Sequence, residues 1–100
     1  MTTHSGCSWD YPEDVALAYG EDRGLRLMLA FVRDDDAAKG AVYDEIGDCA
    51  QCWRNMSAYL GGMGSSIALG LAESHGGDRS HVIRQLASQQ ADAAARIRGR

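Results

Sequence analysis

The stretch from Asp48 to Ser74 contains the longest uncharged run of the chain, and its apolar residues have the spacing of one helix face. They follow one another at steps of four and three: Cys49, Trp53, Met56, Leu60, Met63 and Ile67. This spacing is typical of the seam between packed helices. Asp48 is a good N-cap for such a helix, and Gly76-Gly77 is a good stop. The stretch therefore predicts one long helix at about 48–75, with Gly61-Gly62 as the place where it would kink or break.

A second stripe of the same predicted helix consists of small residues at every fourth position. Its members are Ala58, Gly62, Ser66 and Gly70. Small residues let another helix approach closely, either inside a fold or in a membrane helix pair. The uncharged run from Asn55 to Ala72 is close to spanning length, but its glycines, serines and asparagine lower its hydropathy. These residues argue against a membrane partner and predict a tight helix–helix contact.

Caps and stops divide the rest of the chain into further helices. Pro12 starts a short helix that Gly20 would end, Asp22 would cap the next, and Asp78 would cap the last. The predicted helices lie at about 12–19, 23–33, 37–46, 48–75 and 79–98. Strand signals are absent, because β-branched residues are sparse and apolar residues do not alternate. The predicted fold class is all-α: a small bundle of four main helices plus a short N-terminal helix.

Length and composition set limits on organisation and partners. Residues 1–9 lack periodicity and predict a flexible N-terminal tail, and the 100-residue length predicts a single helical domain over 10–100. The formal net charge of −4 argues against nucleic acid as the main partner. No secretory signal is visible, which predicts a cytoplasmic protein with reduced thiols. The alanine-, aspartate- and arginine-rich composition, with the single lysine Lys39, resembles that of small proteins from actinobacteria and their phages.

The three cysteines are the most specific chemical feature. Cys49 and Cys52 form a CxxC pair in the first turn of the predicted central helix, whose N-terminus favours a thiolate. A thioredoxin-like motif follows a strand, however, and no strand is predicted here. His4 and Cys7 form a second pair with the same spacing, and the two pairs together would complete a tetrahedral zinc site. The preferred interpretation makes Cys49 a small core residue and expects no metal or cofactor. The zinc site formed by His4, Cys7, Cys49 and Cys52 stays open as an alternative.

Three other features have simpler interpretations than chemistry. The triplet Asp34–Asp36 is expected to cap the following helix, since it lacks the spaced ligands of a calcium loop. His75 and His81 lie near serines without any nucleophile motif, so catalysis is not expected there. Five arginines lie in the last predicted helix or directly after it: Arg79, Arg84, Arg96, Arg98 and Arg100. These residues either complement the helix dipole or make 79–98 the recognition helix of a helix-turn-helix.

The prediction from the sequence is a small non-enzymatic adaptor, regulator or inhibitor that binds another protein or itself, with a homodimer as one form. The candidate partner-binding residues lie on the central helix: Trp53, Ala58, Tyr59, Gly62, Ser66 and Gly70. A zinc- or thiol-dependent regulatory module and a DNA-binding regulator are the two alternatives.

Overall fold

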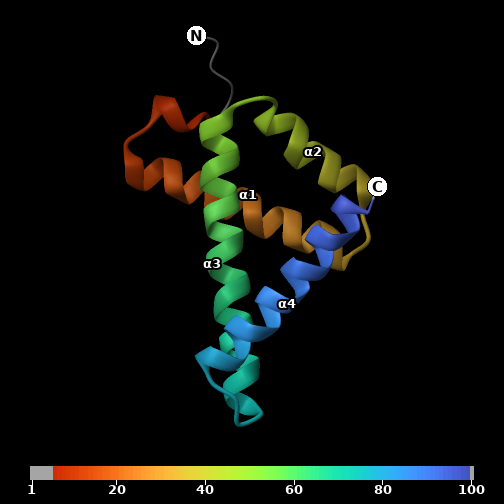
Figure 1. Ribbon diagram of the computed structural model, residues 1–100. Coiled ribbons are helices and arrows are strands. Elements are labelled where there is room, and N and C mark those ends of the chain that lie inside the picture. The colour runs from red at the N-terminus through yellow and green to blue at the C-terminus, as the bar shows by residue number, and fades with distance from the viewer. Residues whose placement is uncertain (1–5, 100) are drawn as a thin grey trace. The chain divides into compact units, whose positions relative to one another are not determined.

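The computed structural model describes residues 6–99, and these residues form helices joined by short turns (Figure 1). The helices are α1 (Glu13–Val32), α2 (Asp36–Ile46), α3 (Ala50–Ser74) and α4 (Arg79–Arg98), preceded by the 3-10 turn η1 (Ser8–Asp10). No strand occurs among the described residues, so the all-α prediction is confirmed. Within that part of the chain, no helix combines the length and apolar character that crossing a bilayer requires.

The first two predicted helices, 12–19 and 23–33, are in fact one helix, α1. The sequence predicts Gly20 as a helix stop, but this residue lies inside α1, at the point where α1 crosses α3. A Cβ at Gly20 would come within 2.9 Å of the Asn55 backbone, and one at Gly24 would come within 2.8 Å of the Tyr59 ring. Glycine at position 20 lets the backbones of α1 and α3 approach closely, and glycine at position 24 leaves room for the Tyr59 ring, which explains both glycines in a helix interior despite their low propensity.

The other boundaries follow the predicted caps closely. The Asp35 carboxylate accepts a bond from the Ala38 amide at 3.0 Å at the start of α2, and Asp78 accepts one from the His81 amide at 3.0 Å at the start of α4. Gly47 and Gly76 end α2 and α3 with positive φ, and the second of these is the predicted Gly76-Gly77 stop. α3 is the exception: it begins at Ala50, so that Cys49 and not the predicted Asp48 occupies its N-cap position, and it runs through Gly61-Gly62 without a break.

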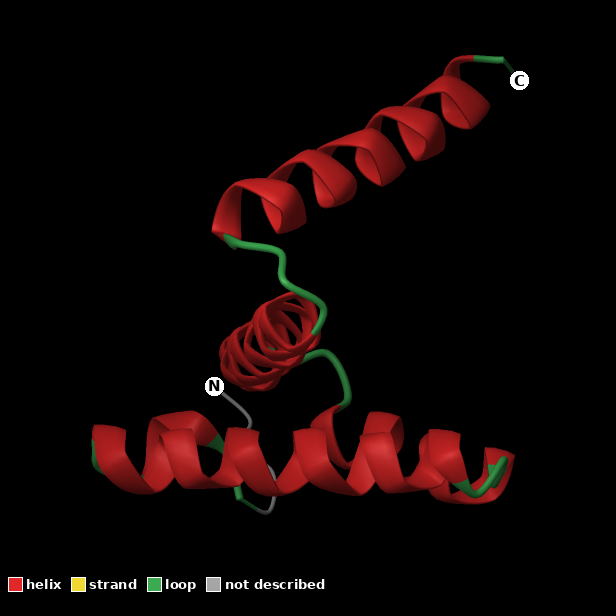
Figure 2. Cartoon of the chain, turned by 90° about the horizontal axis from the view of Figure 1, so that it is seen from below, coloured by secondary structure: helices red, strands yellow, loops and turns green. Residues whose placement is uncertain are grey.

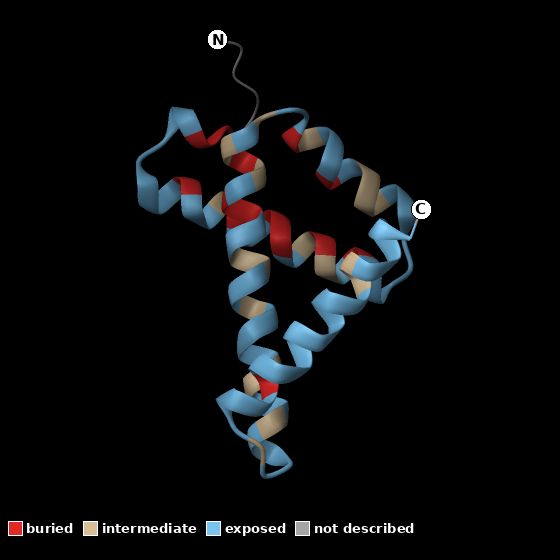
Figure 3. Ribbon diagram, in the orientation of Figure 1, coloured by how far each residue is buried: buried red, intermediate tan, exposed pale blue. Residues whose placement is uncertain are grey.

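The chain divides into two compact units, one ending at Gly62 and the other beginning at Met63, so that α3 contributes to both. In the first unit, α1 and α2 form a layer that the first half of α3 crosses (Figure 2). Its core consists mainly of apolar residues from all these elements: Cys7, Leu27, Val42, Ile46, Cys52 and Met56. Figure 3 shows this cluster of buried residues along α1, α2 and the start of α3.

Arg23 is a charged residue inside this core, with its side chain fully buried. Its Nε donates to Glu45 of α2 at 3.0 Å, and its guanidinium lies 5.3 Å from the centre of the Tyr19 ring. Arg26 donates to the same carboxylate, which compensates the cost of burying these charges. Glu45 therefore joins α2 to α1.

The second unit contains the end of α3 and α4, joined by a tight turn in which the Gly77 amide donates to the Ala72 carbonyl at 2.7 Å. Val82 is its only buried residue among those described. The prediction of a single domain over 10–100 stays a prediction. Of the predicted flexible tail, 1–5 lie outside the described residues, while Cys7 and Ser8 are buried against α3.

Candidate metal centre

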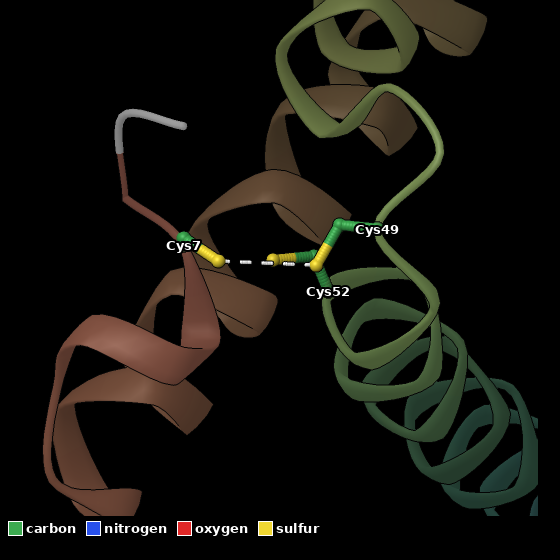
Figure 4. Close-up of side chains that lie close together, drawn as sticks. All are labelled: Cys7, Cys49 and Cys52. Atoms are coloured by element: carbon green, nitrogen blue, oxygen red, sulfur yellow. Dashed lines mark hydrogen bonds between the residues drawn. The ribbon is translucent and has the colours of Figure 1, made fainter. Parts of the chain in front are cut away.

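Three thiols from two distant segments meet at the N-terminal end of α3 (Figure 4). Cys7 precedes η1, Cys49 occupies the N-cap position of α3, and Cys52 lies in the first turn of that helix. The three sulfur atoms all lie within 4.8 Å of one another, and the Cys7 and Cys49 sulfurs are 3.9 Å apart. All three cysteines are free thiols. The sequence separation of 42 residues between Cys7 and Cys49 makes this a tertiary site rather than a local turn.

The segment that carries Cys7 is held in place by α1. Gly6 has φ +69°, and a Cβ there would lie 2.7 Å from the Tyr19 ring and 2.8 Å from Nη2 of Arg23. The same Nη2 donates to the Gly6 carbonyl at 3.0 Å. Because Arg23 is itself fixed by Glu45, the buried guanidinium positions the backbone next to Cys7.

The sulfur of Cys52 lies among polar groups, although the side chain is fully buried. The Ser8 amide donates to this sulfur at 3.3 Å, and the Ser8 hydroxyl oxygen lies 3.4 Å from it. Asn55 donates its side-chain amide to that hydroxyl oxygen at 2.9 Å, so the hydroxyl proton remains available for the sulfur. The Ser8 backbone amide directed at the sulfur orients it, as such second-shell hydrogen bonds orient the ligands of metal sites.

Cys49 is the only half-buried thiol of the three. Burial raises its pKa above that of an ordinary thiol, and the neighbouring sulfurs of Cys52 and Cys7 raise it further, while the Cys52 amide opposes this effect. Without an ion, Cys49 is therefore protonated at neutral pH and is a poor nucleophile for thiol–disulfide exchange. A metal ion displaces such a proton, so the arrangement fits a ligand better than a redox catalyst.

The sulfur spacing also fits a metal ion. A zinc–sulfur bond of about 2.3 Å places two thiolates of a tetrahedral site about 3.8 Å apart. The observed 3.9 Å between Cys7 and Cys49 is close to that value, and the other two separations require only small side-chain adjustments. Soft thiolate ligands favour zinc or Cu(I) over magnesium and calcium.

The structure brings together Cys7, Cys49 and Cys52 of the alternative zinc site predicted from the sequence, while His4 lies outside the described residues. Sequence reasoning missed Ser8 and Asn55, which support the Cys52 sulfur. Neither belongs to a ligand motif. Asn55 follows Cys52 by one helical turn, and only its position on the same face of α3 was available as a signal.

The predicted partner-binding residues of α3 fall into two groups. Trp53 and Tyr59 are half-buried inside the first unit: the Trp53 indole donates to the Gly47 carbonyl at 2.8 Å and stacks on Tyr43, while the Tyr59 ring covers Gly24. The other four are exposed: Ala58, Gly62, Ser66 and Gly70. A Cβ at Gly62 or Gly70 would meet no described atom within 4 Å. The partner-binding role of this set stays a prediction.

The histidines of the second unit lie at helix ends. Nδ1 of His75 is 2.9 Å from the Leu71 carbonyl and 3.2 Å from the Ser74 hydroxyl, which makes His75 part of the end of α3. The backbone amide of His81 donates to the cap residue Asp78.

No protein-family model, curated protein or solved structure matches this chain.

Proposed function

We propose that the chain is a small, non-enzymatic regulatory module whose first unit is assembled around one zinc ion held by Cys7, Cys49 and Cys52. The single observation that carries this proposal is the convergence of three thiols from distant segments within 4.8 Å. His4, three residues before Cys7, is the fourth ligand that the sequence spacing predicts, and it lies outside the residues that the structure describes.

A short chain gains much from such an ion. The core of the first unit is small, and chains of this size are marginally stable on hydrophobic burial alone. Structural zinc supplies about 10–16 kcal/mol of apparent binding free energy in small zinc-binding peptides. Since the ion would join the segment before η1 to α3, much of that free energy would stabilise the docked N-terminal segment.

A regulatory role follows from the connection between this site and the helix crossing. Ser8 contacts both the Cys52 sulfur and Asn55, and the Asn55 backbone lies against Gly20 of α1. Loading or loss of the ion would therefore change the order of the N-terminal segment and of the α1–α3 contact together. A partner that binds the surface formed by the N-terminal segment and the α1–α3 contact would therefore bind the zinc-loaded and zinc-free forms with different affinities.

Native mass spectrometry of the full chain, purified with and without added zinc, tests the proposal. We expect one zinc per chain, removed by a strong chelator together with a fall in melting temperature. Cys52→Ser should abolish binding, whereas Ser57→Ala, an exposed change on the same helix, should leave it intact. A metal-free chain whose melting temperature is unchanged by chelator and by added zinc would contradict the proposal.

A second candidate function is self-association through the second unit. A groove there is lined by residues from the end of α3 and the first half of α4, with Leu71, Val82 and Leu86 as its apolar contacts. Ile83 and Leu86 are 58% and 51% exposed, although two-helix hairpins need an apolar partner for stability. Equilibrium sedimentation should show a monomer–dimer equilibrium that Leu86→Asp weakens. A monomer at every concentration would remove this candidate.

The DNA-binding alternative, with α4 as the recognition helix, keeps only the arginines of that helix in its favour. Binding through them would fall steeply with salt concentration. A chain that shifts no duplex DNA even at low salt would exclude it.

A further inference from the structure

We propose that Cys49 is an oxidation site for small hydroperoxides, that Cys7 is its resolving thiol, and that the resulting disulfide expels the bound ion. This inference rests on the proposed zinc role, and it adds a means of regulation to it. The observations that carry it are the unequal burial of the three thiols and their mutual positions.

Access to the cluster is limited to one cysteine. Cys7 is 1% exposed and Cys52 is fully buried, whereas Cys49 is half-buried just before the first residue of α3. A small oxidant in solution therefore reaches the Cys49 sulfur first. Metal-bound thiols are deprotonated, so in the loaded protein Cys49 would meet the oxidant as a thiolate.

The chemistry needs two steps. The Cys49 thiolate attacks the hydroperoxide, so that a sulfur–oxygen bond forms, the oxygen–oxygen bond breaks, and an alkoxide or hydroxide leaves and takes a proton from water. The Cys7 thiolate then attacks the sulfenic sulfur of Cys49, the sulfur–sulfur bond forms, and hydroxide leaves and is protonated to water. The hydroperoxide accepts two electrons, which the two sulfurs supply.

The contacts of Cys52 favour Cys7 as the resolving thiol, because all three sulfurs lie within 4.8 Å of one another and distance alone does not decide between them. The Cys7 and Cys49 sulfurs are already 3.9 Å apart, and closing to a disulfide of about 2.05 Å requires a movement of about 2 Å. The Cys52 sulfur is held by the amide and the hydroxyl of Ser8, and these contacts would have to break before it could move. Pairing Cys7 with Cys49 removes two of the three thiolate ligands, so the ion would be released.

The N-terminal segment would stay attached in both states. In the loaded state the ion joins Cys7 to α3, and in the oxidised state the disulfide does so. The two states would differ in the charge and shape around Cys52, whose sulfur would keep its bonds to Ser8 but lose its metal.

The test treats the zinc-loaded full chain with stoichiometric hydrogen peroxide. Zinc release is followed with a chromogenic chelator, and disulfides are assigned by tandem mass spectrometry without reduction. We expect one equivalent of zinc released for each Cys7–Cys49 disulfide formed. When the zinc-loaded wild-type chain is treated with peroxide in the presence of dimedone, the trapped adduct should form on Cys49.

Two outcomes separate this inference from the zinc role itself. A chain that binds zinc but keeps it under peroxide, or that forms a Cys49–Cys52 disulfide or a dimedone adduct on Cys52, would overturn the inference and leave the zinc role standing. A chain that binds no zinc but forms the Cys7–Cys49 disulfide would overturn the zinc role, and with it the release of an ion by oxidation, and would leave only the pairing of the two thiols.

Discussion

The two units of this chain are stabilised in different ways. All but one of the buried side chains among the described residues belong to the first unit, together with the buried guanidinium of Arg23, its partner Glu45 and the three thiols. The second unit contributes Val82 alone to the buried set, and several of its large apolar side chains are exposed: Ile67, Leu71, Ile83, Leu86 and Ile97. The stability of the first unit therefore comes from buried side chains and their specific contacts. The second unit buries little, and its stability rests on the amphipathic pattern of its two helical segments.

Glycines show the same contrast. In the first unit, Gly20 and Gly24 permit the close approach of α1 and α3, and any side chain there meets Asn55 or Tyr59. On the exposed stripe of α3, a Cβ at Gly62 meets no described atom within 4 Å. A stripe of small residues therefore does not identify a helix contact by itself. The glycines that permit the contact between α1 and α3 lie on α1, not in the small-residue stripe of α3.

The largest expected effect is the loss of stability of the first unit when one of the proposed zinc ligands is removed. Cys52→Ser should lower the free energy of unfolding of the zinc-loaded first unit by about 3–5 kcal/mol, since both a ligand and the acceptor of the Ser8 bonds are altered. Both tryptophans lie in the first unit and the second has no aromatic residue, so tryptophan fluorescence reports the first unit alone. Wild-type protein with chelator should melt like the variant, and the variant should be insensitive to chelator. Equal melting of all samples would contradict this.

Glu45→Gln should give the next largest effect. Hydrogen bonds from Arg26, and then from Arg23, lower the pKa of Glu45, while partial burial opposes them. A lowered pKa means that the carboxylate contributes stability that is present above the unfolded pKa of about 4.3 and is lost as the pH falls through the lower folded value. We expect a loss of about 2 kcal/mol at neutral pH and a flatter decline of stability in acid. Urea unfolding between pH 7 and pH 3 measures both the loss at neutral pH and the decline in acid. A pH dependence equal to that of the wild type would show that Glu45 does not join α2 to α1 through a charged contact.

A pair of glycine variants tests the helix crossing. Gly20→Ala should destabilise the chain by about 1–3 kcal/mol, because its Cβ would meet the Asn55 backbone. Gly62→Ala, the matched control in an exposed helix interior, should stabilise it by about 0.5–1 kcal/mol through helix propensity. Chemical denaturation followed by far-UV circular dichroism compares the two. Effects of the same sign would show that the close approach of α1 and α3 is not the cause.

The smallest effect concerns the second unit. Ile83→Gln changes an exposed side chain, so it should alter the stability of the first unit by less than about 0.5 kcal/mol. If the second unit mediates self-association, the same change should weaken the dimer in sedimentation experiments. A large loss of tryptophan-detected stability would mean that Ile83 contributes to the stability of the first unit.

Much of the fold could be predicted from the sequence, because local chemistry determined it. Asp35, Gly47, Gly76 and Asp78 act as the caps and stops that their side chains and backbone freedom predict. Gly20 was misinterpreted because its role depends on Asn55, far away along the chain, and local patterns contain no such information.

The candidate site shows the same limit. The spacing of the cysteine pairs raised a zinc site as an alternative, but the preferred interpretation treated Cys49 as a packing residue. Burial of Cys7 depends on Arg23 and Tyr19 of α1, and support of the Cys52 sulfur depends on Ser8. These are tertiary contacts between residues without a shared motif, so the convergence of the three thiols became visible only in the folded chain.

X-ray absorption at the zinc edge of the loaded protein tests the central claim most directly, because it counts the atoms bound to the ion. The account predicts three sulfur neighbours at about 2.3 Å and one lighter neighbour. Cys49→Ser should reduce the sulfur count by one. A first shell made only of nitrogen and oxygen atoms would contradict the assignment of Cys7, Cys49 and Cys52 as the metal centre.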